Sequence, residues 1–271
     1  MARWWLRWGV LLASAMVCAE DKAATTAGQV MQANVQAMGG EEAWKRVQSV
    51  FRKGAISGQE YNWIRFGDRL ATEPIEFENY AQRPGRRLAL LHTHSGPTSY
   101  ACDGDGWTWS YSRLQGLGKH KATGRDQFFC VEVFQPWPLV WQQLGWSAEL
   151  KGAKTIDGRK AWLLHVIPDQ GEAEDDYFDA ATALLVRSER MLEGGVHMRS
   201  AYSDYREVEG VKFPFRIVTH LDHVAGETTS VEGVSEIRDI RLNVPMEDAW
   251  FRVPVPGRAR TTAPTTAPTH P

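Results

Sequence analysis

The chain has 271 residues, of which 43% are hydrophobic and 24% charged. This composition supports a real apolar core and excludes a disordered or fibrous protein. Lysine and arginine number 31 against 33 aspartate and glutamate residues, so the formal net charge is −2. Because no basic field is available to attract phosphates, we expect no nucleic-acid binding.

The amino terminus has the pattern of a secretory signal. Arg3 and Arg7 flank the start of a short apolar run over 8–17, and small residues follow it. The run is about half of the roughly 20 apolar residues that a spanning helix needs, so we favour export over a membrane anchor. We expect cleavage after Ala19, which leaves an exported chain with 29 basic and 33 acidic residues and a net charge of −4.

The chain contains three cysteines, which are Cys18, Cys102 and Cys130. They are too few for a disulfide-built scaffold and wrongly spaced for a paired-cysteine zinc module. Lipid anchoring at Cys18 stays open but is disfavoured, because no small residue precedes that cysteine directly. After export only Cys102 and Cys130 remain, so we expect either a disulfide between them or two separate buried thiols.

The last residues have the composition of a disordered tail. Residues 257–271 are rich in Pro, Thr and Ala and hold no apolar side chain larger than Ala. Such a segment cannot offset its ordering entropy by burial. Since no repeat or linker divides the residues before it, we expect a signal over 1–19, a single domain over 20–256 and a disordered tail over 257–271.

Two short helices are predicted at the start of the domain. Apolar residues at positions 30, 31, 35 and 38 follow helical spacing behind Thr25 and Thr26, the two candidate caps, and a glycine pair ends the helix. A second helical turn over 41–47 carries Trp44.

From residue 49 onward the apolar period changes to two, which predicts short antiparallel strands joined by turns. The predicted strands lie near 49–57, 60–67, 74–82, 87–94, 98–102, 107–112, 149–156, 160–167, 174–179, 183–190, 196–206, 212–222 and 227–240.

One apolar segment, at about 126–146, interrupts the strand pattern, and we call it the lid segment. Pro136 and Pro138 forbid a continuous helix there, so we expect two short helices with a turn between them. Its many aromatic residues must be shielded from water. Either the segment closes one opening of the sheet as plain core, or it covers an apolar cavity.

Several short stretches follow one another in a characteristic order between about 26 and 254: Gly-Gly-Glu at 39–41, Tyr-Ala-Cys-Asp-Gly at 100–104, Asp-Gly-Arg-Lys-Ala-Trp at 157–162, Val-Glu-Gly-Val-Lys-Phe-Pro at 208–214 and Ile-Arg-Leu-Asn-Val-Pro at 240–245. In this order the chain resembles the LolA-like family of outer-membrane lipoprotein-sorting proteins.

The resemblance implies a mainly β fold with a few helices. Its centre is a strongly curved antiparallel sheet, a half-open β-barrel, with a helical lid and an apolar concave face. It also implies an exported, periplasmic protein that binds lipid or lipoprotein acyl chains as a carrier or a sensor. An inner- or outer-membrane protein is the partner such a role suggests.

The residues themselves also favour a hydrophobic binder, because large aromatic side chains share strand faces at two-residue spacing. We expect an apolar cavity lined by strand residues and lid residues, with each buried ligand methylene contributing about 0.8 kcal/mol. The predicted ligand-binding residues are Trp107, Trp109, Tyr111, Phe134, Trp137, Val140, Trp141, Trp162, Leu164, Val166, Phe215 and Ile217.

Common catalytic motifs are absent from the sequence, including the nucleophile elbow, the phosphate-binding loop, the dinucleotide glycine triad and the zincin helix. We therefore expect no enzymatic activity, no cofactor and no metal. The alternative is a metal-assisted hydrolase that uses His92 and His94, which share one strand face. A plain partner-binding module is a third hypothesis.

Overall fold

The computed structural model describes residues 26–58, 73–93, 96–113, 115–121, 135–169, 172–192, 194–222 and 230–252. Four predicted features lie outside these ranges: the signal over 1–19, the strand at 60–67, the first part of the lid segment and the tail over 257–271. The structure does not test them.

Two helices begin the described chain, where the sequence predicts them. Helix α1 (Ala27–Ala37) has Thr26 as its N-cap, and Thr26 and Gln29 form a reciprocal capping box. Helix α2 (Glu41–Arg46) carries Trp44, whose indole Nε1 donates a hydrogen bond of 3.1 Å to the Met38 carbonyl. This bond ties α2 to the C-terminal end of α1. Neither helix, nor any other described helix, is long and apolar enough to cross a membrane.

Thirteen strands form one antiparallel sheet. They are β1 (Ser49–Gly58), β2 (Ile75–Gln82), β3 (Arg86–Thr93), β4 (Gly96–Asp103), β5 (Trp107–Ser112), β6 (Gly116–Lys121), β7 (Ser147–Ile156), β8 (Arg159–Ile167), β9 (Glu174–Asp179), β10 (Leu185–Leu192), β11 (Val196–Val208), β12 (Val211–Asp222) and β13 (Ser230–Leu242). Their order is β6-β5-β4-β3-β2-β1-β13-β12-β11-β10-β9-β8-β7, so β6 and β7 are the two edges.

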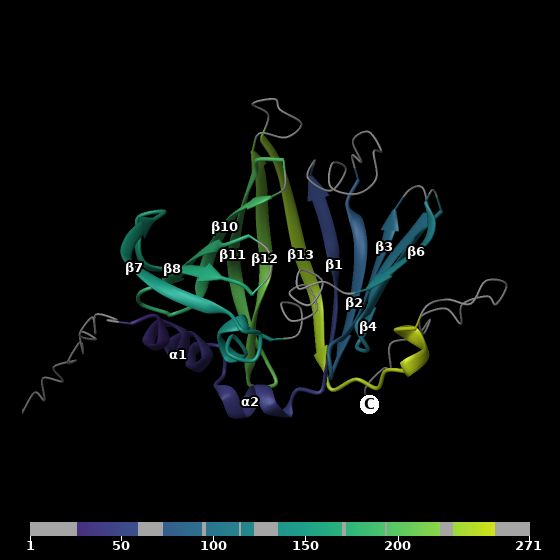
Figure 1. The fold of residues 1–271 in the computed structure, drawn as a ribbon, viewed down its shortest axis with the longest axis horizontal. Coiled ribbons are helices and arrows are strands. Elements are labelled where there is room, and N and C mark those ends of the chain that lie inside the picture. Colours follow the sequence, from purple (N-terminus) through teal and green to yellow (C-terminus); the bar gives the residue numbers. More distant parts are fainter. Residues whose placement is uncertain are drawn as a thin grey trace, which may run out of the picture.

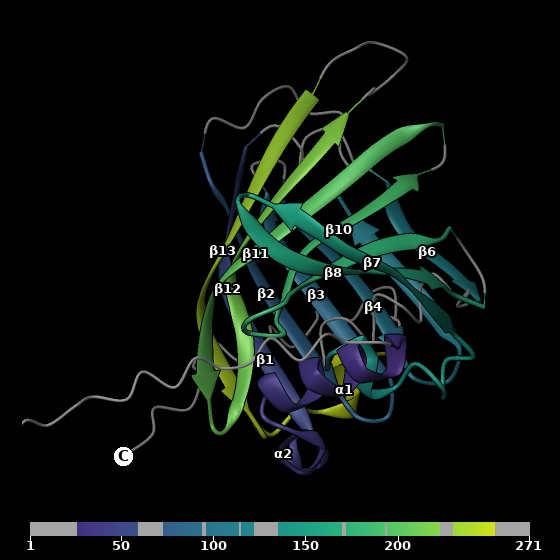
Figure 2. The ribbon, with the colours of Figure 1, turned by 90° about the vertical axis from the view of Figure 1, so that its left-hand side faces the viewer.

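The sheet is curved and is not closed into a barrel, which confirms the predicted fold class. Figure 1 shows β7 and β6 on opposite sides of the molecule, with β13 and β1 between them and both helices at one end of the strands. In the perpendicular view of Figure 2, α1 lies at the same end as α2, in front of the more distant strands β2–β4.

Strand β1 joins the two halves of the sheet, because it pairs with β2 on one side and with β13 on the other. The β1–β13 register shifts between Lys53 and Gly54, which marks an irregularity of the bulge type. Gly54 is required there: a Cβ at this position would press on the Glu236 carbonyl oxygen and lie 2.9 Å from Ile237 Cα.

The two faces of the sheet have different covers. We call the face that carries α1, α2 and the lid segment the inner face, and its buried residues include Val50, Phe77 and Phe213. On the outer face, a second cluster around Trp109 is covered by the chain that follows β13. The Trp109 indole donates a hydrogen bond of 2.9 Å to the Phe251 carbonyl, and Phe251 is fully buried.

The strand predictions agree with the structure for twelve strands, but β6 was not predicted. Its sequence, Gly-Leu-Gly-Lys-His-Lys, lacks the β-branched and aromatic residues that indicate a strand. It is a strand because β5 supplies a continuous ladder from Trp107–Lys121 to Ser112–Gly116. The described part of the lid segment contains a 3₁₀ helix, η1 (Trp137–Leu139), with turns after it, rather than a longer helix.

The close approach at Gly54 gives a stability prediction. Gly54→Ala should lower the free energy of unfolding by about 1–3 kcal/mol, because the added methyl group meets β13 backbone that cannot move aside. Gly28→Ala, in α1, is the matched control, since the nearest atom to its added methyl is 3.9 Å away and alanine favours a helix by about 0.5–1 kcal/mol. Urea denaturation measures both. Equal effects of the two substitutions would contradict the prediction.

Cys102 is buried on β4 and is disulfide-bonded. Its partner lies outside the described residues, so the bond to Cys130 stays a prediction.

The mature chain, alkylated without reductant under denaturing conditions, should gain no alkyl group, and it should gain two after reduction. The bond should stabilise the fold by about 3–4 kcal/mol. Two groups added without reductant would contradict the pairing.

Candidate functional site

A cavity of about 390 Å³ lies against the inner face of the sheet. This volume is within the roughly 300–1,000 Å³ that is typical of small-molecule sites. Its described lining combines both helices, the lid segment and strands from both halves of the sheet: Asn34, Met38, Trp44, Arg52, Ile56, Phe77, Asn79, Arg87, Ala89, Leu91, Tyr100, Gln135, Pro136, Trp137, Pro138, Glu174, Asp176, Phe178, Leu185, Tyr202, Tyr205, Phe213, Pro214, Ile217, Ser235 and Ile237.

The apolar wall of the cavity comes from the middle of the sheet and from α2. Phe77, Phe213 and Ile237 belong to strands that meet at or near β1, and all three are buried in one core cluster. The Trp44 ring packs edge-on against Phe213, with the centroids 5.2 Å apart. Because these rings are held by packing on the helix side, the wall keeps its form without a ligand.

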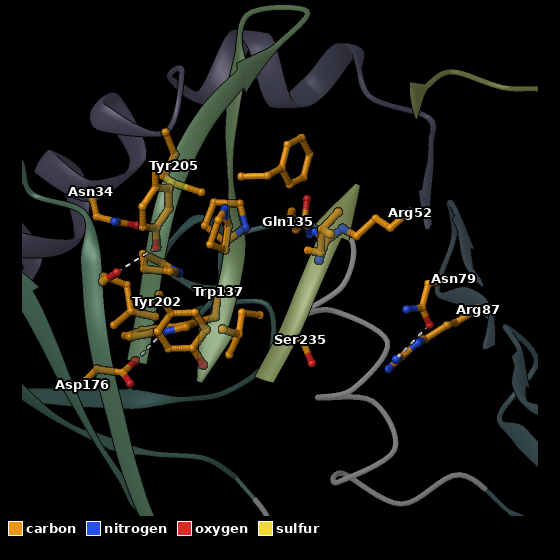
Figure 3. Close-up of a pocket in the computed structure, with 18 of the residues that line it drawn as sticks. Asn34, Arg52, Asn79, Arg87, Gln135, Trp137, Asp176, Tyr202, Tyr205 and Ser235 are labelled. Carbon is orange, nitrogen blue, oxygen red and sulfur yellow. Dashed lines mark hydrogen bonds between the residues drawn. The ribbon is translucent and has the colours of Figure 1, made fainter. Parts of the chain in front are cut away.

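Trp137 fixes the lid segment to the β8–β9 side of the sheet. Its ring contacts Phe178, with centroids 6.3 Å apart, and belongs to the cluster that includes Val30 of α1. The indole Nε1 donates a hydrogen bond of 2.7 Å to Oδ2 of Asp176, a carboxylate that is only 2% exposed. Figure 3 shows this bond at the edge of the cavity. The lid segment is therefore held by a directional polar contact as well as by packing.

Charged groups of opposite sign lie on two walls. Arg52 of β1 and Arg87 of β3 line one wall, where the Arg52 guanidinium stands 4.9 Å from the centre of the Phe213 ring. Glu174 and Asp176 of β9 line the other wall, and Glu174 makes an ion pair of 3.3 Å with Arg190. Figure 3 shows Arg52 and Arg87 on one side of the cavity and Asp176 on the other.

Two tyrosines of β11 complete the acidic wall. Tyr205 donates a hydrogen bond of 2.7 Å from its hydroxyl to the Leu185 carbonyl. Burial, and next the charge of Asp176, raise the pKa of Tyr205 well above its usual range, so the phenol stays neutral. Tyr202 shares a 3.1 Å hydrogen bond with Ser188. Both hydroxyls are thus used within the protein, and their rings face the cavity.

Two of the residues predicted to bind a ligand, Trp137 and Ile217, line the cavity. The others with inner-face positions serve as core beside it. Trp162, Leu164 and Val166 pack with α1 and Trp137, and Trp141 covers the same cluster; Val140 and Phe215 are buried without lining the cavity. Phe134 lies outside the described residues.

The structure corrects the placement of Trp107, Trp109 and Tyr111. They share one strand face, as their spacing predicts, but it is the outer face, away from the cavity. Trp109 is buried there under Phe251, while Trp107 and Tyr111 are exposed. Two-residue spacing fixes that residues share a face, and it gives no information about which face is inner.

None of the predicted ligand-binding residues belongs to the β1–β4 wall, which includes Arg52, Phe77, Arg87 and Leu91. A weak signal exists for Phe77, Arg87 and Leu91, because alternation along 74–82 and 87–94 places each of them on one face of its predicted strand. That signal does not distinguish the cavity face from the face beneath the C-terminal chain.

Only one member of the histidine pair belongs to the part of the chain that the structure describes, so a metal site at the pair stays untested. His92 is exposed on β3, opposite Glu76 and Pro97, and His94 lies outside the described ranges. The described part of the chain holds no group of three or more His, Cys, Asp and Glu residues that could bind a metal ion.

The Trp137–Asp176 bond gives a second stability prediction. Trp137→Phe should lower the free energy of unfolding by about 1–3 kcal/mol, because a buried carboxylate loses a donor while the aromatic contact remains. Trp141→Phe, in the same segment and against the same cluster, is the control and should have a smaller effect. Chemical denaturation of both variants tests the claim, which fails if the control is equally destabilised.

Comparisons with known proteins identify the fold. No family model and no curated protein sequence matches the chain. A LolA superfamily protein from Nitrosomonas europaea superimposes with a TM-score of 0.57 at 12% identity, covering 85% of this chain and 99% of that one. A DUF1329 family protein from Desulfovibrio piger gives 0.56 at 15% identity, covering 83% and 96%.

A putative outer-membrane lipoprotein-sorting protein domain from Vibrio parahaemolyticus gives a TM-score of 0.54 at 10% identity, with 83% of this chain and 95% of that one covered. At such low identity the likeness shows the fold alone, and in all three comparisons it covers at least 95% of the other chain. The protein therefore has a LolA-like fold, as the order of its sequence elements implied.

Proposed function

We propose that this protein is exported to the periplasm and holds the acyl chain of a lipid or lipoprotein in its inner-face cavity, as a carrier or a sensor. The observation that carries the proposal is the cavity itself. It is an apolar space of about 390 Å³ between the middle of a curved sheet and a lid segment anchored by Trp137.

The chemistry of the lining suits an aliphatic ligand. Rings and branched side chains such as Phe77, Phe213 and Ile217 form most of the central wall. Each methylene that moves from water into such a space contributes about 0.8 kcal/mol. Charged side chains such as Arg52, Arg87 and Asp176 stand on the side walls, where they would orient a ligand with a polar end.

The fold and the disulfide support the compartment and the role. A LolA-like fold is shared with a protein described as a putative outer-membrane lipoprotein-sorting domain, and we extend that role to this chain as a proposal. The disulfide at Cys102 fits an oxidising compartment outside the cytoplasm. The signal pattern before Ala19 agrees with export.

The proposal assigns binding rather than catalysis. The described cavity lining has no histidine or cysteine, and the hydroxyls of Tyr202 and Tyr205 form hydrogen bonds within the protein. A carrier of this kind would receive its ligand from, and deliver it to, membrane proteins or membranes.

Filling the cavity tests the proposal directly. Ser235→Trp should weaken the binding of a fluorescent long-chain fatty acid at least about tenfold, or roughly 1.4 kcal/mol, because Ser235 lines the cavity and the indole would occupy it. Ser203→Trp adds the same side chain on β11 at an exposed position outside the cavity and is the matched control. Fluorescence titration of the probe measures both variants.

A wild-type chain that binds no acyl probe, or a Ser203→Trp variant that loses binding equally, would contradict the proposal. Native mass spectrometry of the purified protein gives an independent reading, since a carrier should retain co-purified lipid that the Ser235→Trp variant lacks.

A further inference from the structure

The β5–β6 hairpin presents an unusual surface on the outer face of the sheet. Its register pairs Trp107 with Lys121, Trp109 with Lys119 and Tyr111 with Leu117, so these six side chains point to the same side. Trp109 is buried beneath the C-terminal chain, and the other five are exposed. We call Trp107, Tyr111, Leu117, Lys119 and Lys121 the hairpin patch.

The apolar members of the patch are exposed to an extent that is rare elsewhere in the described chain. Trp107 is 36% exposed, Leu117 41% and Tyr111 43%. They make up three of the five large exposed hydrophobic residues among the described ranges, and the other two, Ile167 and Met191, lie on strands of the other half of the sheet. A cluster of exposed aromatic and aliphatic side chains marks an interaction surface.

Positive charge accompanies these apolar residues. Lys119 places its Nζ 4.3 Å from the centre of the Trp107 ring, and Lys121 lies directly across from Trp107. Residues 107–121 contain no aspartate or glutamate. The acidic residues nearest in sequence lie in the β4–β5 turn. There Asp103 Oδ1 accepts hydrogen bonds from the backbone amides of Asp105 and Trp107, and these bonds stabilise the turn.

We propose that the hairpin patch docks the protein onto the surface of an anionic lipid bilayer. Tryptophan and tyrosine favour the boundary between headgroups and acyl chains, since each combines an apolar ring with a polar end. Lysines close to an anionic surface contribute about 1 kcal/mol each. The patch places both kinds of side chain on one face of a narrow edge hairpin, which suits shallow contact with a bilayer.

The net negative charge of the whole protein favours one orientation of the molecule at an anionic bilayer. The mature chain has a net charge of −4, so an anionic bilayer repels most orientations of the molecule and attracts the patch. The docking surface is on the outer face, and the acyl cavity is on the inner face. Docking through the hairpin patch is therefore a property beyond the proposed acyl-chain binding, and each of the two can be tested without the other.

The test uses residues 20–271, because the apolar signal would itself bind lipid and lies outside the described fold. Flotation with vesicles of phosphatidylglycerol and phosphatidylcholine measures the partition coefficient, and vesicles of phosphatidylcholine alone measure the apolar contribution. Wild-type protein should float with the anionic vesicles and should be released by high salt. Lys119→Gln together with Lys121→Gln should lower the partition coefficient on the order of 30-fold, at about fivefold for each lysine.

Trp107→Ser together with Tyr111→Ser should also reduce binding to anionic vesicles. Two control variants make corresponding changes elsewhere. Lys151→Gln with Lys154→Gln removes two lysines from the opposite edge strand, and Ile167→Ser with Met191→Ser removes the other two large exposed hydrophobic side chains. Both controls should bind like wild type. Circular dichroism and acyl-probe titration verify that the patch variants remain folded and keep a working cavity.

Failure of the wild-type chain to float with anionic vesicles would overturn the docking proposal, whatever the acyl probe does. Equal losses in the patch and control variants would also overturn it. Flotation that disappears in Ser235→Trp but persists in the patch variants would show that the cavity, rather than the hairpin patch, makes the lipid contact, and it would overturn the proposal as well.

Discussion

The pairing of β1 with β13 is the constraint on which the rest of the structure depends. Without it the chain would contain two separate antiparallel meanders, β1–β6 and β7–β13, each with an apolar face too large to leave in water. The ladder from Val50–Leu242 to Gly58–Gly233 joins them into one sheet. The irregularity at Gly54 allows close approach in the middle of this ladder, where the sheet must bend around the cavity.

The curved sheet uses different covers on its two faces, and this difference decides where a ligand can enter. On the outer face, Trp250 and Phe251 pack directly on Tyr80 and Trp109, so the apolar surface there is filled by the protein's own chain. On the inner face, α1, α2 and the lid segment meet the sheet mainly on one side and leave the central strands partly uncovered. The cavity is thus apolar surface for which the described chain provides no complete cover.

The charged groups of the cavity come from both halves of the sheet. Arginines come from β1 and β3, whereas the carboxylates come from β9. Buried Asp176 is tolerated because the Trp137 indole donates to it, and this bond in turn holds the lid segment near the sheet. One interaction therefore both donates a hydrogen bond to a buried carboxylate and shapes the site.

The sequence alone determined the local elements: capping and a glycine pair define α1, and two-residue periodicity defines the strands, except for β6, whose glycines and lysines carry no strand signal. It also identified Trp137 and Ile217 as cavity residues. It could not place Arg52, Phe77 or Arg87 in the site, and it assigned Trp109 to the wrong face. Alternation is symmetric between the two faces of a strand, so only the tertiary packing of the helices on one side and of Phe251 on the other decides which face encloses the cavity.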